Sequence, residues 1–100
     1  MRIFFERTGG FSGLRFKASL DAELLPPQQA RRLRKLLEES HFFELPLRLE
    51  PAVSRPDRFQ YRLTVENDNC VHTVQASEDA IPSEMRPLLD WLMSTARQSK

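Results

Sequence analysis

The sequence predicts an α+β fold: a single domain over residues 1–100, in which two helices pack on one face of a four-stranded antiparallel sheet. Four short segments rich in Phe, Ile, Leu and Val have strand patterns, and two longer segments have apolar residues at helical spacing. These segments follow one another in the order ββαββα. A chain of 100 residues is long enough to form one hydrophobic core without disulfides.

The first two strands are expected at residues 2–7 and 14–20, joined by a turn that contains all 3 glycines of the chain. Glycine adopts positive φ at little steric cost, so this turn should bend sharply. Apolar and polar residues alternate in the second strand, which indicates that one of its faces is exposed to solvent. In the first strand Ile3 and Phe5 should point inward and Phe4 outward, although the Phe doublet leaves Phe4 either exposed or covered.

A helix should begin at Pro26-Pro27 and end near Ser40, because prolines are tolerated in the first helical turn. One side of this helix is expected to face the core: Ala30, Leu33, Leu36, Leu37 and Ser40. The opposite side is charged, and Arg34 and Glu38 have the spacing of an i,i+4 ion pair. These features predict a surface helix packed on a sheet.

A long loop punctuated by Pro46, Pro51 and Pro56 is expected next, and its apolar residues need cover. Residues 59–66 then alternate strictly between apolar and polar side chains, which predicts the third strand. The turn residues Asn67-Asp68-Asn69 lead into the fourth strand, from Cys70 to Ser77.

The last helix should begin after Pro82, with one apolar side: Met85, Leu88, Leu89, Leu92 and Ala96. Pro87 should either kink this helix or make residues 82–86 a separate short turn, with the regular helix starting near Pro87. Trp91 borders the apolar side and is expected at the margin of the core.

The composition argues against several partners and locations. Fifteen basic and 14 acidic residues give a net charge of +1, which provides no strong attraction to nucleic acid or to an anionic membrane. The 1 cysteine cannot form an internal disulfide, and neither a signal peptide nor an apolar segment of about 20 residues is present. We therefore expect a cytoplasmic, soluble monomer.

Residues for catalysis or metal binding are scarce in this sequence. The 2 histidines, His41 and His72, are far apart in sequence, so a zinc-binding His-Glu-x-x-His motif is absent. Cys70 and His72 should face the same side of a strand, but the favoured interpretation is a small buried cysteine and a structural histidine. No nucleophile elbow or phosphate-binding loop occurs. We expect no enzyme, no metal and no cofactor.

A basic cluster on the first helix, Arg31, Arg32, Arg34 and Lys35, has two interpretations. A solvated helix face is favoured, because two glutamates offset half of the charge and no aromatic residues are interleaved with it. The other interpretation is a nucleic-acid footprint, which predicts strongly salt-dependent binding.

The glycine turn is the strongest candidate for a functional, partner-binding surface. A hairpin can turn in two residues, whereas this one uses several and places Phe11 near its tip. Phe11 either folds back over the end of the core or is an exposed anchor for a partner. The residues alone do not decide between these two roles.

Several segments, spread over nearly the whole chain, carry a resemblance to a known family: Met1-Arg2-Ile3 through Gly13, Leu25-Pro26-Pro27, Asp57-Arg58-Phe59-Gln60-Tyr61-Arg62-Leu63-Thr64-Val65, His72-Thr73-Val74 followed by Ser77-Glu78, and Arg86-Pro87-Leu88-Leu89-Asp90-Trp91-Leu92. As an ordered set they resemble the emfourin (protealysin inhibitor) family of small bacterial proteins. The resemblance implies a protein that inhibits thermolysin-like, protealysin-type zinc metallopeptidases of the same bacterium.

The resemblance also directs attention to the turn as the part that blocks the active-site cleft of the peptidase. Thermolysin-like enzymes favour a bulky apolar side chain after the scissile bond, which Phe11 would provide. A zinc contact would come from the hydroxyl of Thr8 or Ser12, or from a loop carbonyl; these alternatives stay open. The expected protease-binding residues comprise the turn and a polar rim on the same side of the sheet: Thr8, Gly9, Gly10, Phe11, Ser12 and Gly13, with Arg7, Arg15, Gln60 and Arg62. The alternative function is a cytoplasmic adaptor or regulatory module with no protease target.

Overall fold

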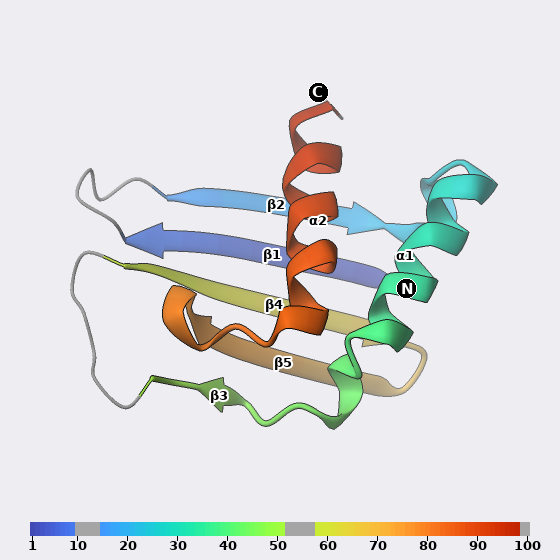
Figure 1. Cartoon of the computed structure of the whole chain (residues 1–100). Coiled ribbons are helices and arrows are strands. Elements are labelled where there is room, and N and C mark those ends of the chain that lie inside the picture. The colour runs from blue at the N-terminus through green and yellow to red at the C-terminus, as the bar shows by residue number, and fades with distance from the viewer. Residues whose placement is uncertain (10–14, 52–57, 99–100) are drawn as a thin grey trace.

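Two helices lie on one face of a five-stranded mixed sheet, in a computed structural model that describes residues 1–9, 15–51 and 58–98 (Figure 1). The strands and helices follow in the order β1 (Arg2–Gly9), β2 (Phe16–Asp21), α1 (Pro27–Glu39), β3 (Arg48–Leu49), β4 (Phe59–Asn67), β5 (Cys70–Ser77) and α2 (Arg86–Gln98). Short 3-10 helices lie between them: η1 (Ala22–Leu24), η2 (Phe42–Glu44), η3 (Glu78–Ala80) and η4 (Ser83–Met85). In the sheet the strands lie in the order β2-β1-β4-β5-β3.

The predicted four-stranded antiparallel sheet and the order ββαββα are wrong in one respect. A fifth strand, β3, pairs in parallel with β5, so the sheet is mixed. Next to this strand, the N–H of Gln75 donates a hydrogen bond to the carbonyl of Leu47 at 2.6 Å. A strand of only 2 residues shows no period in the sequence. It forms because the segment after α1 passes along the edge of β5, whose backbone groups need partners.

The residues of the central strands β1 and β4 show which face of the sheet is covered by the helices and which is open. They pair in antiparallel fashion from Arg2 opposite Glu66 to Gly9 opposite Phe59. Ile3 and Phe5 are buried beneath the helices, whereas 40% of Phe4 is exposed on the other face, which confirms the predicted inward and outward positions. The alternation predicted for β4 is also confirmed, because Leu63 and Val65 are fully buried while Gln60 and Arg62 are exposed.

Both helices bury the sides that their spacing predicts. In α1 the buried residues are Leu33, Leu36 and Leu37, and Ala30 is half-buried. Ser40, which follows the helix, is also buried, and its hydroxyl donates to the Leu37 carbonyl at 2.9 Å. In the last helical segment they are Met85, Leu88, Leu89 and Leu92, and Trp91 packs at the margin of the core as predicted. The side chain of Ala96 lies outside the described residues. Neither helix in the described ranges is long and apolar enough to cross a bilayer.

Pro87 follows the second of the two predicted alternatives. Residues Ser83–Met85 form the separate turn η4, and α2 begins at Arg86, which puts Pro87 in the first turn of the helix. At that position the missing N–H of proline has no helical partner to lose. The helix therefore needs no kink at this residue.

Candidate functional site

The end of β1 approaches the beginning of β4 so closely that only glycine fits. Gly9 has a φ of 98°, and a Cβ built on it would lie 2.8 Å from the carbonyl oxygen of Arg58. Other residues avoid this region of φ, and no real Cβ approaches a backbone oxygen so closely. Of the 3 glycines in the turn, this is the one that the structure describes, and it has the sharply bent, closely approached backbone that the sequence predicts.

The beginning of β4 is held by two acidic residues of η3. The N–H of Phe59 donates to the Glu78 carboxylate at 3.1 Å. The Arg58 guanidinium lies 3.9 Å from the Glu78 carboxylate and 3.4 Å from that of Asp79. About a third of each of these three side chains is exposed, so solvent weakens the ion pairs. Their main effect is to fix where β4 begins relative to Gly9.

Arg7 belongs to the helix side of the sheet, not to the open side. It follows Ile3 and Phe5 at two-residue spacing, and its guanidinium carbon lies 4.4 Å from the centre of the Phe59 ring. This cation–π contact ties the end of β1 to the first residue of β4. The expected polar rim is therefore divided between the two faces of the sheet.

Two predicted rim residues, Gln60 and Arg62, share the open face with the predicted turn residue Thr8. Thr8 lies opposite Gln60 on the open face, and Arg62 is the next residue of β4 on that face. Arg15 is exposed immediately before β2. The predicted turn residues Gly10, Phe11, Ser12 and Gly13 lie outside the described residues.

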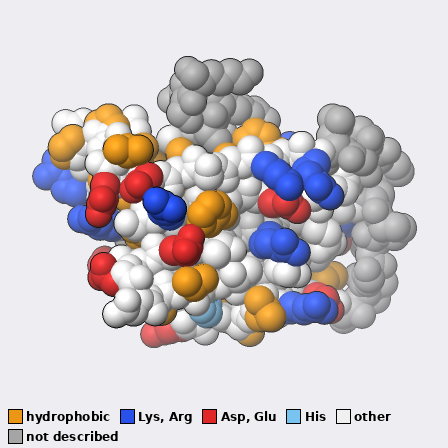
Figure 2. Space-filling view, turned by 180° about the vertical axis from the view of Figure 1, so that it is seen from behind, with side chains coloured by type: hydrophobic (Ala, Val, Ile, Leu, Met, Phe, Trp, Pro, Cys, Tyr) orange, Lys and Arg blue, Asp and Glu red, His pale blue; other side chains and the backbone are white. Residues whose placement is uncertain are grey.

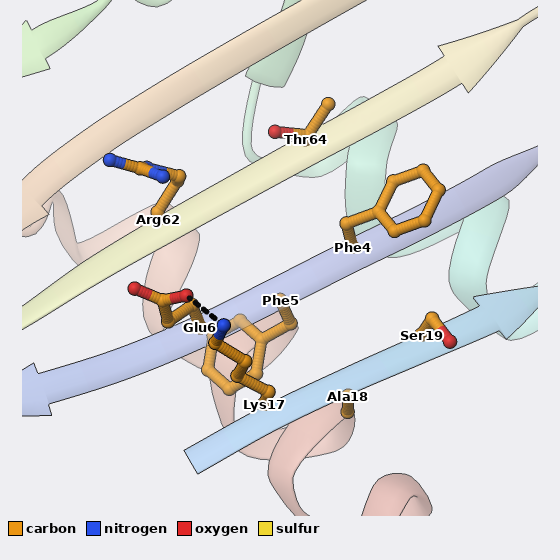
Figure 3. A pocket seen from close by; sticks show the side chains of 8 residues that line it. All are labelled: Phe4, Phe5, Glu6, Lys17, Ala18, Ser19, Arg62 and Thr64. Atoms are coloured by element: carbon orange, nitrogen blue, oxygen red, sulfur yellow. Dashed lines mark ion pairs between the residues drawn. The ribbon is translucent and has the colours of Figure 1, made fainter. Parts of the chain in front are cut away.

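The open face of the sheet holds a shallow hollow of about 470 Å³ next to this rim. Figure 3 shows the eight residues that line it, which come from three neighbouring strands: Phe4, Phe5 and Glu6 of β1, Lys17, Ala18 and Ser19 of β2, and Arg62 and Thr64 of β4. The ammonium of Lys17 lies 3.7 Å from the Glu6 carboxylate. Phe4 supplies an apolar wall, and Lys17 and Arg62 supply positive charge. This combination suits a partner surface with an apolar and an acidic side chain close together.

A smaller hollow of about 70 Å³ continues from the first toward the hairpin turn. It is lined by Glu6 and Arg62, which border both hollows, and by Thr8, Gln60, Tyr61 and Gln75. Figure 2 shows the open face, with Lys and Arg side chains over the half that is nearer to Gly9. The face is therefore concave and basic where it meets the turn.

Sequence reasoning missed Lys17 and Glu6, which line the hollow, and Glu78, which holds the start of β4. The period-two pattern of the hairpin contains a signal for the first two, because both fall on the face opposite Ile3 and Phe5. No local signal indicates Glu78, which is separated from Phe59 by 19 positions.

His72 is a structural residue, as the favoured interpretation predicts. Its Nε2 lies 2.9 Å from the carbonyl oxygen of Leu45, and its ring packs edge-on against Phe42 at 5.2 Å between centroids. Cys70 is exposed at the start of β5, which contradicts its expected burial. The described part of the chain contains no group of three or more His, Cys, Asp or Glu side chains placed to hold a metal ion.

The basic cluster on α1 lies far from the hollows of the sheet face. Arg31, Arg32, Arg34 and Lys35 are all exposed. Exposure agrees with the favoured interpretation of a solvated helix face but does not test nucleic-acid binding, which stays the alternative interpretation.

Comparison with known proteins gives one family. The model of the emfourin family matches residues 5–93, which include the hairpin from Phe5 onward, the whole of α1, β3, β4 and β5, and α2 as far as Met93. No curated protein and no solved structure matches the chain significantly.

Proposed function

The chain belongs to the emfourin family, a family of inhibitors, and from this we propose that it inhibits thermolysin-like, protealysin-type zinc metallopeptidases. The observation that carries the proposal is the family match, which extends over residues 5–93 and so includes both strands of the glycine-containing hairpin. An inhibitor of this kind needs no catalytic group or cofactor of its own, because it acts by occupying the site of another enzyme.

We propose that the turn between β1 and β2 occupies the active-site cleft, with Phe11 in the pocket that receives the apolar side chain after the scissile bond. The base of the turn supports this role, because Gly9, Arg7 and Arg58 each contact β4 or its neighbour η3. Because the base is fixed before binding, less conformational entropy is lost there on association, which favours affinity.

The open face supplies the second part of the proposed contact. Thr8, Gln60 and Arg62 lie together beside the turn, around the smaller hollow. We propose that they form the polar rim, with Arg15 at its margin, and that Arg7 supports the turn from the helix side. The hydroxyl of Thr8 or Ser12, or a loop carbonyl, would be the donor nearest to the zinc ion of the peptidase.

The test is a titration of purified thermolysin-like peptidase with this protein, with preincubation and a small peptide substrate. We expect stoichiometric loss of activity without cleavage of the added protein. Phe11→Ala should weaken inhibition by roughly 30-fold or more, the usual effect of removing a buried aromatic anchor. Phe43→Ala is the matched control, since 44% of Phe43 is exposed and it lies near Asp68, at the opposite end of the sheet from Gly9.

Each outcome of this titration is informative. If Phe11→Ala folds normally and inhibits as strongly as the unchanged protein, the turn is not in the cleft. If the unchanged protein is digested, or leaves several thermolysin-like enzymes fully active, the inhibitor proposal fails and the adaptor function takes its place.

A further inference from the structure

The open face of the sheet carries charged residues in two rows that run across β2, β1 and β4. The row nearer to Gly9 comprises Lys17, Glu6 and Arg62, which lie opposite one another in the strand pairing. The other row comprises, in the same strand order, Asp21, Arg2 and Glu66. Each of the three strands therefore has one positive and one negative residue on this face, four positions apart.

The row between the two charged rows has no charge. It comprises Ser19, Phe4 and Thr64 and continues to Thr73 of β5, whose hydroxyl lies 2.9 Å from that of Thr64. Figure 3 shows the Phe4 ring turned away from Glu6. The hollow of about 470 Å³ therefore lies between this ring and the charged row that is nearer to Gly9.

Most of these charges are not neutralised by ion pairs within the chain. Lys17 and Glu6 approach each other at 3.7 Å. In the part of the chain that the structure describes, Arg2, Arg62 and Glu66 make no ion pair, although each has an opposite charge on the neighbouring strand. These groups are therefore available to a partner whose charges match them.

The face is complementary to a second copy of itself. A half-turn about an axis along the uncharged row lays each strand over its own copy in the antiparallel direction and exchanges the two charged rows. Every charged residue then meets the opposite charge of the same strand: Lys17 meets the partner's Asp21, Glu6 meets the partner's Arg2, and Arg62 meets the partner's Glu66. A two-fold interface requires this kind of self-complementarity.

The shape of the face also suits this arrangement. Packed sheets lie about 10 Å apart with their strands within about 30° of each other, a distance that long charged side chains from both sides can span. The half-turn directs the partner's Phe4 ring, which is turned away from its own Glu6, over the hollow of the first chain. The helices lie on the other face of each sheet, so those of the two copies stay apart (Figure 1).

We propose that two copies of this chain associate through the open faces of their sheets, with the two-fold axis along Ser19, Phe4 and Thr64. The three strands and five positions that carry the contact measure roughly 15 Å in each direction. Such a small interface gives a weak dimer, with a dissociation constant in the micromolar to millimolar range. The dimer differs from the monomer expected from the sequence.

The dimer is a property separate from the proposed inhibition, although the two share a surface. It covers Arg62, which the proposed function places in the polar rim, so a second copy and a peptidase compete for the open face. An inhibition titration at submicromolar concentration leaves so weak a dimer dissociated. Failure of the inhibitor proposal and failure of the dimer are therefore measured independently.

Sedimentation equilibrium between about 10 µM and about 1 mM is the test. The unchanged protein should form dimers. Glu66→Lys should weaken the dimer roughly tenfold or more, because its two contacts with Arg62 become repulsive; Glu66 lies outside both hollows and outside the proposed rim. Glu39→Lys is the matched control, since it changes the net charge equally but lies exposed on α1, on the helix side. This control should dimerise like the unchanged protein.

A mixture of two charge variants separates contact between copies from effects on folding. Arg62→Glu alone should also weaken the dimer, because it then faces the partner's Glu66. An equimolar mixture of Glu66→Lys and Arg62→Glu should dimerise again, since both contacts are attractive between unlike copies. The neighbours within each chain are the same in the mixture as in the separate variants, so restored association reports the contact between copies.

Phe4→Ala gives an independent readout, because 40% of Phe4 is exposed and its loss leaves the partner's hollow unfilled. It should weaken the dimer roughly tenfold or more, as expected for an aromatic anchor. Thermal unfolding shows whether each variant folds, and Phe4→Ala decides if a charge variant does not. A protein that is monomeric at all concentrations, or a dimer that neither Glu66→Lys nor Phe4→Ala weakens, would overturn the proposal.

Discussion

Replacing Gly9 by alanine should weaken the fold mainly at the base of the hairpin. The residue has a φ of 98°, where an alanine costs about 1–2 kcal/mol more than a glycine. The new Cβ would also lie 2.8 Å from the Arg58 carbonyl oxygen, which belongs to the backbone and cannot rotate away. The chain can relieve this clash by separating the ends of β1 and β4, which weakens the adjacent hydrogen-bonded pair of Thr8 and Gln60 and costs about one hydrogen bond, roughly 1 kcal/mol. The free energy of unfolding should therefore fall by about 2–3 kcal/mol.

Urea unfolding followed by the fluorescence of Trp91, the 1 tryptophan of the chain, measures this change. A loss of about 2 kcal/mol should also lower the Tm by roughly 10 °C in a domain of this size. Gly9→Asn is the control for backbone conformation, because asparagine tolerates positive φ but has the same Cβ. If the close approach matters, Asn should recover only part of the loss. A change below about 0.5 kcal/mol for Gly9→Ala, typical of an unconstrained surface position, would refute the reasoning.

Two further predictions concern the core and the start of β4. Leu63→Ala should lower the free energy of unfolding by about 2–5 kcal/mol, because Leu63 is 0% exposed at the centre of the sheet and the smaller alanine would leave a cavity. A loss below about 1 kcal/mol, measured by urea unfolding, would show that Leu63 is not tightly packed in the core. Arg58→Ala should cost about 1 kcal/mol, since it removes the cation between the carboxylates of Glu78 and Asp79 in a partly exposed group. Part of that loss should disappear in Arg58→Lys, and an Arg58→Ala protein as stable as the original would show that these ion pairs do not hold the start of β4.

Sequence reasoning is reliable where a long segment buries one face. The alternation in β4 and the apolar stripe of α1 each repeat over several residues, and burial of a single face requires such a repeat. The same reasoning places Ile3 and Phe5 in the core, and the chemistry of proline limits Pro87 to two alternatives, of which the structure adopts one.

The candidate site was predictable only in part. Glycine chemistry identifies the turn, and the two-residue period of β1 contains the information that Arg7 and Thr8 lie on opposite faces. The family resemblance, confirmed by the match to residues 5–93, identifies the class of function. The hollow on the open face needs three strands side by side, and no local pattern states which strands are neighbours.

The sequence by itself thus determined the class of the fold, the inward-facing residues of its long elements and the family to which the chain belongs. Only the tertiary structure decided the strand order, the parallel strand β3 and the position of Glu78 beside Phe59. The physical reason is the range of the interactions. Periodicity and turn chemistry act over a few residues, whereas strand neighbours and ion pairs join segments that meet only when the whole chain has packed.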